Sequence, residues 1–258
     1  MRTAAIIPAY QAQDTIARVV TALLEHWPRS EARGTVIVVD DGSADATAEH
    51  ARGAGALVVC HGRNQGKGAA VRTGLRVARD LEFDQVVTVD ADGQHPAEEA
   101  RRVADFSCDP RALVLGVRDL PAAGAPRANQ ISNRISNFFL SVFTGRVLAD
   151  TQCGLRRYPV HETLALDPRD TGYGFEAEVL LLAVRAGLPV IEVPVHVVYP
   201  SHGSHFRVVR DPARIVARVL YTLGRQPPGL IRMADAHPFP EGFPANQNDR
   251  GRRPAESS

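Results

Sequence analysis

The hydrophobic pattern of the first 120 residues alternates between short apolar runs and longer amphipathic stretches. The runs are rich in β-branched residues and too short for helices, which predicts buried strands at residues 4–8, 35–39, 57–59, 85–89 and 113–116. The stretches between them carry apolar residues three and four positions apart, which predicts helices at residues 15–26, 46–53, 66–80 and 96–106. This alternation indicates an α/β fold with a mostly parallel central sheet flanked by helices.

The pattern is less regular in the second half of the chain. It predicts helices at residues 128–143, 175–186 and 211–223, and a strand at residues 190–198. From residue 226 onward the composition shifts to Pro, Gly, Asn and Arg, which predicts a disordered tail over residues 226–258. We therefore expect a single domain over residues 1–225, made of two halves at residues 1–120 and 121–225.

Composition narrows the classes of function. The formal net charge is only +1, so overall charge gives no support for nucleic-acid binding. The three cysteines lie far apart and form no CxxC pair, which favours reduced thiols in a cytoplasmic protein. No stretch reaches the roughly 20 apolar residues that a membrane span needs. Any membrane contact is therefore expected to be peripheral.

Polar clusters follow several of the predicted strands. Tyr10 follows the first strand, Asp40-Asp41-Gly42-Ser43 the second, Asp90–Gln94 the fourth and Arg118 the fifth. In open parallel sheets ligands bind beyond the carboxyl ends of the strands. The sequence therefore predicts one binding site that collects these residues.

The segment Asp90-Ala91-Asp92 is the first candidate for metal chemistry. Residues two apart in an extended segment point to the same side, so both carboxylates can converge on one cation. Gly93 allows the chain to turn, and Gln94 and His95 follow as possible further ligands. Oxygen ligands favour Mg²⁺ or Mn²⁺. The alternative interpretation is a solvated Asp-rich turn.

Two further motifs suit a nucleotide. Asp40 and Asp41 precede a predicted helix, so one of them can contact a base or ribose while Ser43 or Asp45 caps the helix. The loop Gly62-Arg-Asn-Gln-Gly-Lys-Gly68 precedes the next helix, where a phosphate can bind at the helix N-terminus. It is not a P-loop, because Gly68 stands where the final Ser or Thr is required. The alternative is an ordinary glycine-rich turn.

Taken together, the motifs resemble family 2 glycosyltransferases of the GT-A (nucleotide-diphospho-sugar transferase) fold. The matching segments are Ile6-Ile-Pro-Ala-Tyr10, Val38-Val-Asp-Asp-Gly-Ser43, Asn64-Gln-Gly-Lys-Gly68 and Val89-Asp-Ala-Asp-Gly-Gln-His-Pro96. Gly116-Val-Arg118 and Asp150-Thr-Gln-Cys-Gly154 resemble the subgroup of polyprenyl-phosphate and dolichyl-phosphate-mannose-synthase-like enzymes. The likeness covers roughly residues 4–210.

This resemblance implies a function and a set of site residues. The first half of the domain would bind a nucleotide-sugar donor and the second half an acceptor, a polyprenyl phosphate. The metal, Mg²⁺ or Mn²⁺, would be held by Asp90, Asp92 and Gln94, and catalysis would involve Asp92, Arg118 and Asp150. The donor would be bound by Pro8, Tyr10, Asp40, Asp41, Lys67, Asp90, Ala91 and Arg118. Apart from the resemblance, the basic cluster of His202, His205, Arg207 and Arg210 is expected to bind a donor or acceptor phosphate, and the alternative is a solvated loop.

The chain departs from the family pattern at two places. Ala12 stands where many relatives carry an acid, and Ser204-His205 stands where mannosyl enzymes often show Ser-Lys. Both departures leave the transferred sugar and the exact acceptor open. Alternative functions are transfer to another lipid or to a glycan hydroxyl, and a nucleotide-sugar-binding protein without catalysis.

The chemistry expected of the family is an inverting single displacement. A lipid-phosphate acceptor is already anionic and needs no strong base. An alcohol acceptor needs one, and Asp150, Glu176 and Glu178 are the candidates. The acceptor therefore decides whether a general base must be present.

Two helical stretches are candidates for peripheral contact with the inner face of the membrane. Arg210, Arg214 and Arg218 recur every four residues and so share one helix face. A second stripe combines apolar residues with flanking arginines: Ile131, Ile135, Phe138, Phe139, Val142 and Phe143, with Arg127, Arg134 and Arg146. The alternative is that both helices pack on the sheet and leave their arginines in solvent.

Overall fold

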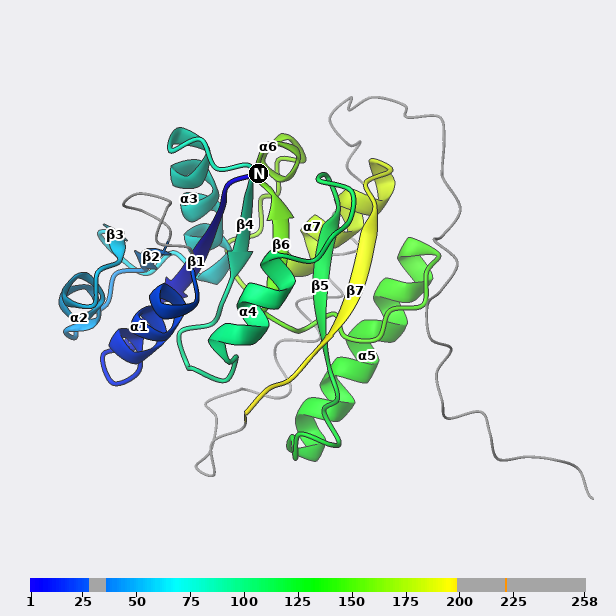
Figure 1. Cartoon of the computed structure of the whole chain (residues 1–258). Helices are drawn as coiled ribbons and strands as arrows, with labels where there is room; N and C mark the ends of the chain where they lie inside the picture. Colours follow the sequence, from blue (N-terminus) through cyan, green and yellow to red (C-terminus); the bar gives the residue numbers. More distant parts are fainter. Residues whose placement is uncertain (28–35, 199–220, 222–258) are drawn as a thin grey trace, which may run out of the picture.

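The computed structural model describes residues 1–27, 36–198 and 221, and these residues are built around one seven-stranded sheet. Along the sheet the strand order is β3-β2-β1-β4-β6-β5-β7 (Figure 1). The hydrophobic pattern correctly predicted the five strands in the first half of the chain and β7 in the second half. The strands are β1 (Thr3–Ala9), β2 (Val36–Asp40), β3 (Leu57–Cys60), β4 (Gln85–Thr88), β5 (Leu113–Arg118), β6 (Arg156–Pro159) and β7 (Val190–Val195).

The sheet is mostly parallel, as the sequence predicts. Neighbours β3, β2, β1 and β4 run parallel, and so do β5 and β7. The exception is β6, which lies between β4 and β5 and is antiparallel to both. This strand was not predicted, because it begins with Arg156 and Arg157 and has no apolar run.

Helices cover both faces of the sheet. In Figure 1, α1 and α4 lie in front of the sheet and α7 lies behind it. One apolar core joins the sheet to α1, α2 and α4, and a second joins it to α3, α5, α6 and α7. The helices are α1 (Ile16–His26), α2 (Thr47–Gly53), α3 (Lys67–Asp80), α4 (Ala97–Ala104), α5 (Arg127–Thr144), α6 (Val160–Ala165) and α7 (Gly174–Arg185).

The start of α2 settles which polar residue serves its first turn. The carboxylate of Asp45 accepts a hydrogen bond from the backbone N–H of Thr47 at 3.0 Å. The hydroxyl of Ser43 instead accepts from the backbone N–H of Gln11 at 2.9 Å. Asp45 therefore provides an acceptor for a backbone N–H group that has no partner within the first turn of α2. Ser43 instead links the end of β2 to the end of β1.

The topology gathers the polar clusters at one edge of the sheet. Since β1, β2, β4 and β5 point the same way, their carboxyl ends lie at the same edge. The antiparallel β6 starts at this edge, where Arg156 is paired with Thr88. The chain just before it, residues 150–154, is thereby brought to the same place. The unpredicted strand thus completes the site.

Several expectations fall on residues outside the described ranges. These are the helix at residues 211–223 with Arg210, Arg214 and Arg218, the donor-site residues His205 and Arg207, and the tail at residues 226–258. Among the described helices, none is both long enough and apolar enough to cross a membrane.

Candidate active site

The two carboxylates of the Asp90-Ala91-Asp92 segment lie directly after β4. Asp92 is exposed, and one of its oxygens accepts from the backbone N–H of Gln94 at 2.9 Å. Although its side chain reaches solvent, desolvation by the surrounding protein atoms and the negative charge of Asp90 both raise the pKa of Asp92. The segment therefore concentrates negative charge at the edge of the sheet.

Lys67 connects this segment to two other parts of the chain. It is the first residue of α3, and its ammonium lies 2.7 Å from Asp90 Oδ1 and 2.9 Å from Glu176 Oε1 in the first turn of α7. Burial alone would raise the pKa of Asp90, but the positive charges led by Lys67 outweigh burial and lower it. Asp90 is thus ionised and paired, whereas Asp92 forms no ion pair with another described residue.

Arg118 and Asp150 form a second ion pair at the same edge. The guanidinium donates to both carboxylate oxygens, with Nε to Oδ2 at 2.6 Å and Nη2 to Oδ1 at 3.1 Å. The backbone N–H groups of Arg118 and Gln152 also donate to this carboxylate. Asp150 is fully buried, and its oxygens are engaged throughout. The geometry makes Asp150 a clamp that fixes the direction of Arg118.

Asp41 lies beside the site but is turned into the protein. It is 3% exposed, and its carboxylate accepts from the backbone N–H groups of Gln65 and Gly66 and pairs with His61 Nδ1. The neighbouring Asp40 is also buried and accepts from the N–H of Ser43. In this conformation Asp41 holds the glycine-rich loop against the end of β2, while Tyr10, at 49% exposure, faces outward.

Two glycines allow the loops of the site to approach one another. A Cβ on Gly154 would lie 2.2 Å from Asp90 Oδ2, so only glycine leaves room for the Asp90 carboxylate. A Cβ on Gly66, whose φ is +100°, would lie 2.2 Å from the carbonyl oxygen of Thr171. The segments after β4, before α3, before β6 and before α7 are therefore in close contact.

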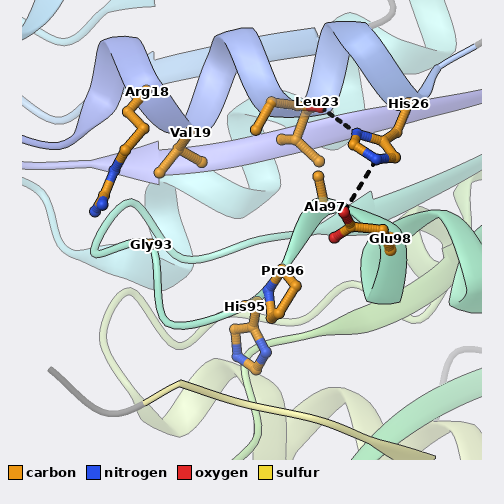
Figure 2. Close-up of a pocket in the computed structure, with 10 residues that line it drawn as sticks. Arg18, Val19, Leu23, His26, Gly93, His95, Pro96, Ala97 and Glu98 are labelled. Carbon is orange, nitrogen blue, oxygen red and sulfur yellow. Dashed lines mark hydrogen bonds and ion pairs between the residues drawn. The ribbon is translucent and has the colours of Figure 1, made fainter.

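His95 and a small cavity lie beside the carboxylate segment. Burial lowers the pKa of His95 to about 4, and its Nδ1 has no hydrogen-bond partner within the described part of the chain. This open cavity, of about 240 Å³, is lined by residues of α1, by Gly93 and by residues 95–98, and Figure 2 shows Arg18 and Val19 of α1 facing the loop at Gly93. Neither Asp90 nor Asp92 lines it. The cavity thus lies next to the proposed metal site and is separate from it.

The donor set at this edge fits a hard divalent cation. Within residues 1–27, 36–198 and 221, no group of three His, Cys, Asp or Glu side chains is placed to hold a metal on its own. Mg²⁺ commonly binds through one or two carboxylates and takes its remaining ligands from water and substrate phosphates. Asp90 and Asp92 match that requirement, and Gln94 lies next to them through its backbone N–H, which donates to Asp92.

The site contains residues that the sequence analysis did not assign to it. Glu176 was considered only as a base for an alcohol acceptor, yet it pairs with Lys67. Gly154 was noted only as part of a motif, yet it packs on Asp90. The acid in the first turn of α7 was the available signal for Glu176, but its partner Lys67 is 109 positions away in sequence.

The mostly parallel sheet flanked by helices, with paired acids after β4 and a glycine-rich loop before α3, is of the GT-A fold class. Solved structures support the fold. A glucosyl-3-phosphoglycerate synthase from Mycobacterium tuberculosis, solved with Mn²⁺, uridine diphosphate and phosphoglyceric acid, superposes with a TM-score of 0.70 at 20% identity. The match covers 86% of this chain and 78% of that one.

The sequence places the chain in a particular family within this class. Residues 4–161 match glycosyl transferase family 2, and the protein belongs to that family. An undecaprenyl-phosphate mannosyltransferase of Micrococcus luteus is 28% identical over 215 residues, covering 79% of this chain and 86% of the relative. A UDP-N-acetylglucosamine–dolichyl-phosphate N-acetylglucosaminyltransferase of Methanococcus voltae is 28% identical over 221 residues, covering 77% and 86%.

Proposed function

We propose that this protein transfers a sugar, with inversion, from a nucleoside-diphosphate sugar to the phosphate of a polyprenyl phosphate. The relatives named for undecaprenyl-phosphate and dolichyl-phosphate acceptors support this acceptor class. In the reaction a phosphate oxygen of the acceptor bonds to the anomeric carbon, and the bond from that carbon to the donor diphosphate breaks. The nucleoside diphosphate is the leaving group.

The observation that carries the proposal is the state of the three carboxylates that could serve an alcohol acceptor as a base. Asp150 is clamped on Arg118, and Glu176 is paired with Lys67. Glu178 is fully buried and accepts from the backbone N–H groups of Arg169 and Asp170. All three carboxylates are committed to internal partners. An acceptor that is already anionic needs no such base.

The side chains at the edge of the sheet have distinct roles in binding the metal, the donor and the acceptor. Asp90, Asp92 and Gln94 would hold the metal, and a bound divalent cation would neutralise charge on the leaving diphosphate. Lys67 supplies a cation on the donor side, and Arg118, fixed by Asp150, presents a cation to the acceptor phosphate. The roles of Pro8, Tyr10, Asp40, Asp41 and Ala91 in holding the nucleotide stay predictions.

The test of the proposed function compares two acceptors of equal chain length. The protein is incubated with radiolabelled nucleotide-sugars, Mg²⁺ or Mn²⁺, and either a short polyprenyl phosphate or the matching polyprenol. We expect a labelled, organic-extractable product from the phosphate and none from the alcohol. Product from the alcohol alone would support the alternative acceptor class. Hydrolysis of the donor with neither acceptor consumed would show an enzyme of a different specificity.

The close contact between Gly154 and Asp90 gives a prediction about the geometry of the site. Gly154→Ala places a methyl group within 2.2 Å of Asp90 Oδ2, so the carboxylate must move. A displacement of about 1 Å in a catalytic group can cost about 10²-fold in rate, and we expect a loss of that order in transfer. The control is Gly53→Ala in α2, where an added Cβ meets nothing within 4 Å. Equal activity of both variants would contradict the tight fit at Gly154.

A lipid acceptor also requires contact with a membrane, and the outer face of α5 is suited to it. Ile131, Ile135, Phe138 and Val142 lie on one face of the helix and are 41–64% exposed. The exposed Arg127 and Arg134 lie on the same helix, which contains no acidic residue. Such an apolar stripe with cationic flanks complements an anionic lipid surface, and we propose that α5 rests on it.

The inner face of α5 connects this surface to the active site. The side-chain amide of Gln152 donates to Ser136 Oγ at 2.9 Å and to Ser132 Oγ at 3.1 Å. Asn137 Oδ1 accepts from both the backbone N–H and the hydroxyl of Thr151 at 2.8 Å. The helix that would meet the lipid therefore also holds the segment that orients Arg118.

Membrane docking is tested with a double substitution, Ile131→Glu with Phe138→Glu. Replacing two exposed apolar anchors by acids removes apolar contact and adds repulsion, so we expect partition onto phosphatidylglycerol vesicles to fall at least about tenfold. Arg79→Glu makes the same change of charge at a distant exposed site and serves as control. Co-sedimentation measures binding, and transfer to a short water-soluble acceptor should survive. Unchanged sedimentation of the double variant would contradict docking through α5.

A further inference from the structure

The Lys67 ammonium is paired with Asp90, the same carboxylate that a divalent cation would use. It lies 2.7 Å from Asp90 Oδ1, and the other side of that carboxylate is packed against Gly154. With Gly154 packed on one side and the ammonium on Oδ1, only part of the Asp90 side chain, which is 29% exposed, is open to a second cation. A metal that binds Asp90 must therefore displace Lys67 or share the carboxylate with it.

A second carboxylate prevents the displaced ammonium from leaving the site. Glu176 Oε1 lies 2.9 Å from the same nitrogen, and the Glu176 side chain is only 10% exposed. The ring of Tyr173 lies 6.0 Å from the ammonium and borders it on another side. Lys67 also begins α3, so a displaced ammonium stays beside a helix N-terminus, where anions are favoured.

We propose that Lys67 couples metal binding to donor binding by exchanging partners. Without a diphosphate its ammonium is the counter-ion of Asp90. When the donor binds, the ammonium moves onto a diphosphate oxygen while it stays paired with Glu176, and Asp90 becomes free for the metal. This inference rests on the proposed function, since it assumes that a nucleoside diphosphate and a divalent cation share the site.

The exchange makes a thermodynamic prediction about two ligands. Metal alone competes with Lys67 for Asp90 and should bind weakly. A nucleoside diphosphate removes that competition, so each ligand should strengthen the binding of the other by the same factor. Coupling between ligands of this kind typically amounts to about 5- to 150-fold. Loss of the lysine should remove its share of the coupling.

The experiment measures Mn²⁺ binding, which needs no turnover. Free Mn²⁺ is followed by electron paramagnetic resonance with the wild type and with Lys67→Met, each with and without UDP or GDP. The complete cycle is measured, so that the association of Mn²⁺ with nucleotide in solution is accounted for. In Lys67→Met we expect Mn²⁺ alone to bind about tenfold more tightly and the coupling factor to fall about tenfold.

Two further variants separate partner exchange from a general effect of charge. Arg76→Gln removes one positive charge at an exposed position further along α3, and its coupling factor should match the wild type. Lys67→Gln is measured together with Lys67→Met, so that the test can still be made if one of the two variants misfolds. An unchanged coupling factor in a folded Lys67 variant that binds both ligands overturns the inference. A wild type that binds neither Mn²⁺ nor nucleotide overturns the proposed function as well.

Discussion

Asp92→Asn is expected to reduce transfer by about 10³-fold or more while the protein stays folded. The substitution keeps the shape of the side chain but removes the anionic oxygen that a divalent cation needs beside a diphosphate. Loss of metal stabilisation of several kcal/mol corresponds to about three powers of ten in rate. The folded state should not suffer, because the raised pKa of Asp92 shows that its negative charge is unfavourable there.

The measurement is kcat/KM with saturating Mg²⁺, together with the thermal midpoint of unfolding. Asp80→Asn is the matched control, since Asp80 is 65% exposed on α3 and pairs with Arg79 at the surface. The control should keep full activity. The midpoint of Asp92→Asn should equal or exceed that of the wild type. Activity within tenfold of the wild type would remove Asp92 from the metal site.

The central sheet could be predicted because its strands are locally distinctive. Runs such as Val36–Asp40 and Gln85–Thr88 are buried throughout, and their apolar β-branched residues suit strands covered on both faces. Their order along the chain, with helices between them, then indicated a mostly parallel sheet. The boundaries of six described helices, α1 to α5 and α7, likewise fall within a few residues of the expected ones, whereas the short helix α6 was not predicted.

The strand β6 could not be predicted, for a physical reason. Arg156 and Arg157 are 0% and 2% exposed, so two charged side chains lie where a strand normally carries apolar ones. Arg157 donates to the carbonyl oxygens of Ala104 and Phe106 at the end of α4. The stabilising partners come from other parts of the chain. The hydrophobic pattern depends only on residues close together in sequence, so it contains no information about these distant partners.

The same distinction applies to the candidate site. Asp90, Asp92 and Gln94 could be proposed because their spacing within one segment suggests a shared cation. That Lys67 pairs with Glu176, and that Asp41 turns toward the glycine-rich loop, depends on contacts between distant segments. The sequence indicated which residue types are available, and the packing of the loops determined which of them pair.

Arg156→Met is expected to be among the most destabilising single changes in the protein. Arg156 is fully buried, and its guanidinium donates to three backbone carbonyl oxygens: Cys153 at 2.9 Å, Glu176 at 3.0 Å and Thr151 at 2.6 Å. Methionine has a similar length but no donor, so the three carbonyls lose their partner in the interior. An unsatisfied buried group costs about 1–3 kcal/mol. Allowing for relaxation, we expect a loss of about 3 kcal/mol in the free energy of unfolding.

Urea denaturation of both proteins measures this loss, with Arg79→Met as the control. Arg79 is 48% exposed and pairs with Asp80 at the surface, so its removal should change the free energy of unfolding by less than about 1 kcal/mol. The same substitution thus has very different effects at two positions, because only Arg156 supplies hydrogen bonds that water cannot replace. A loss below about 1 kcal/mol in Arg156→Met would show that the carbonyls find other partners. In the folded variant, looser segments around Asp150 and Glu176 should also weaken nucleotide binding, since Arg156 fixes the backbone that carries both carboxylates.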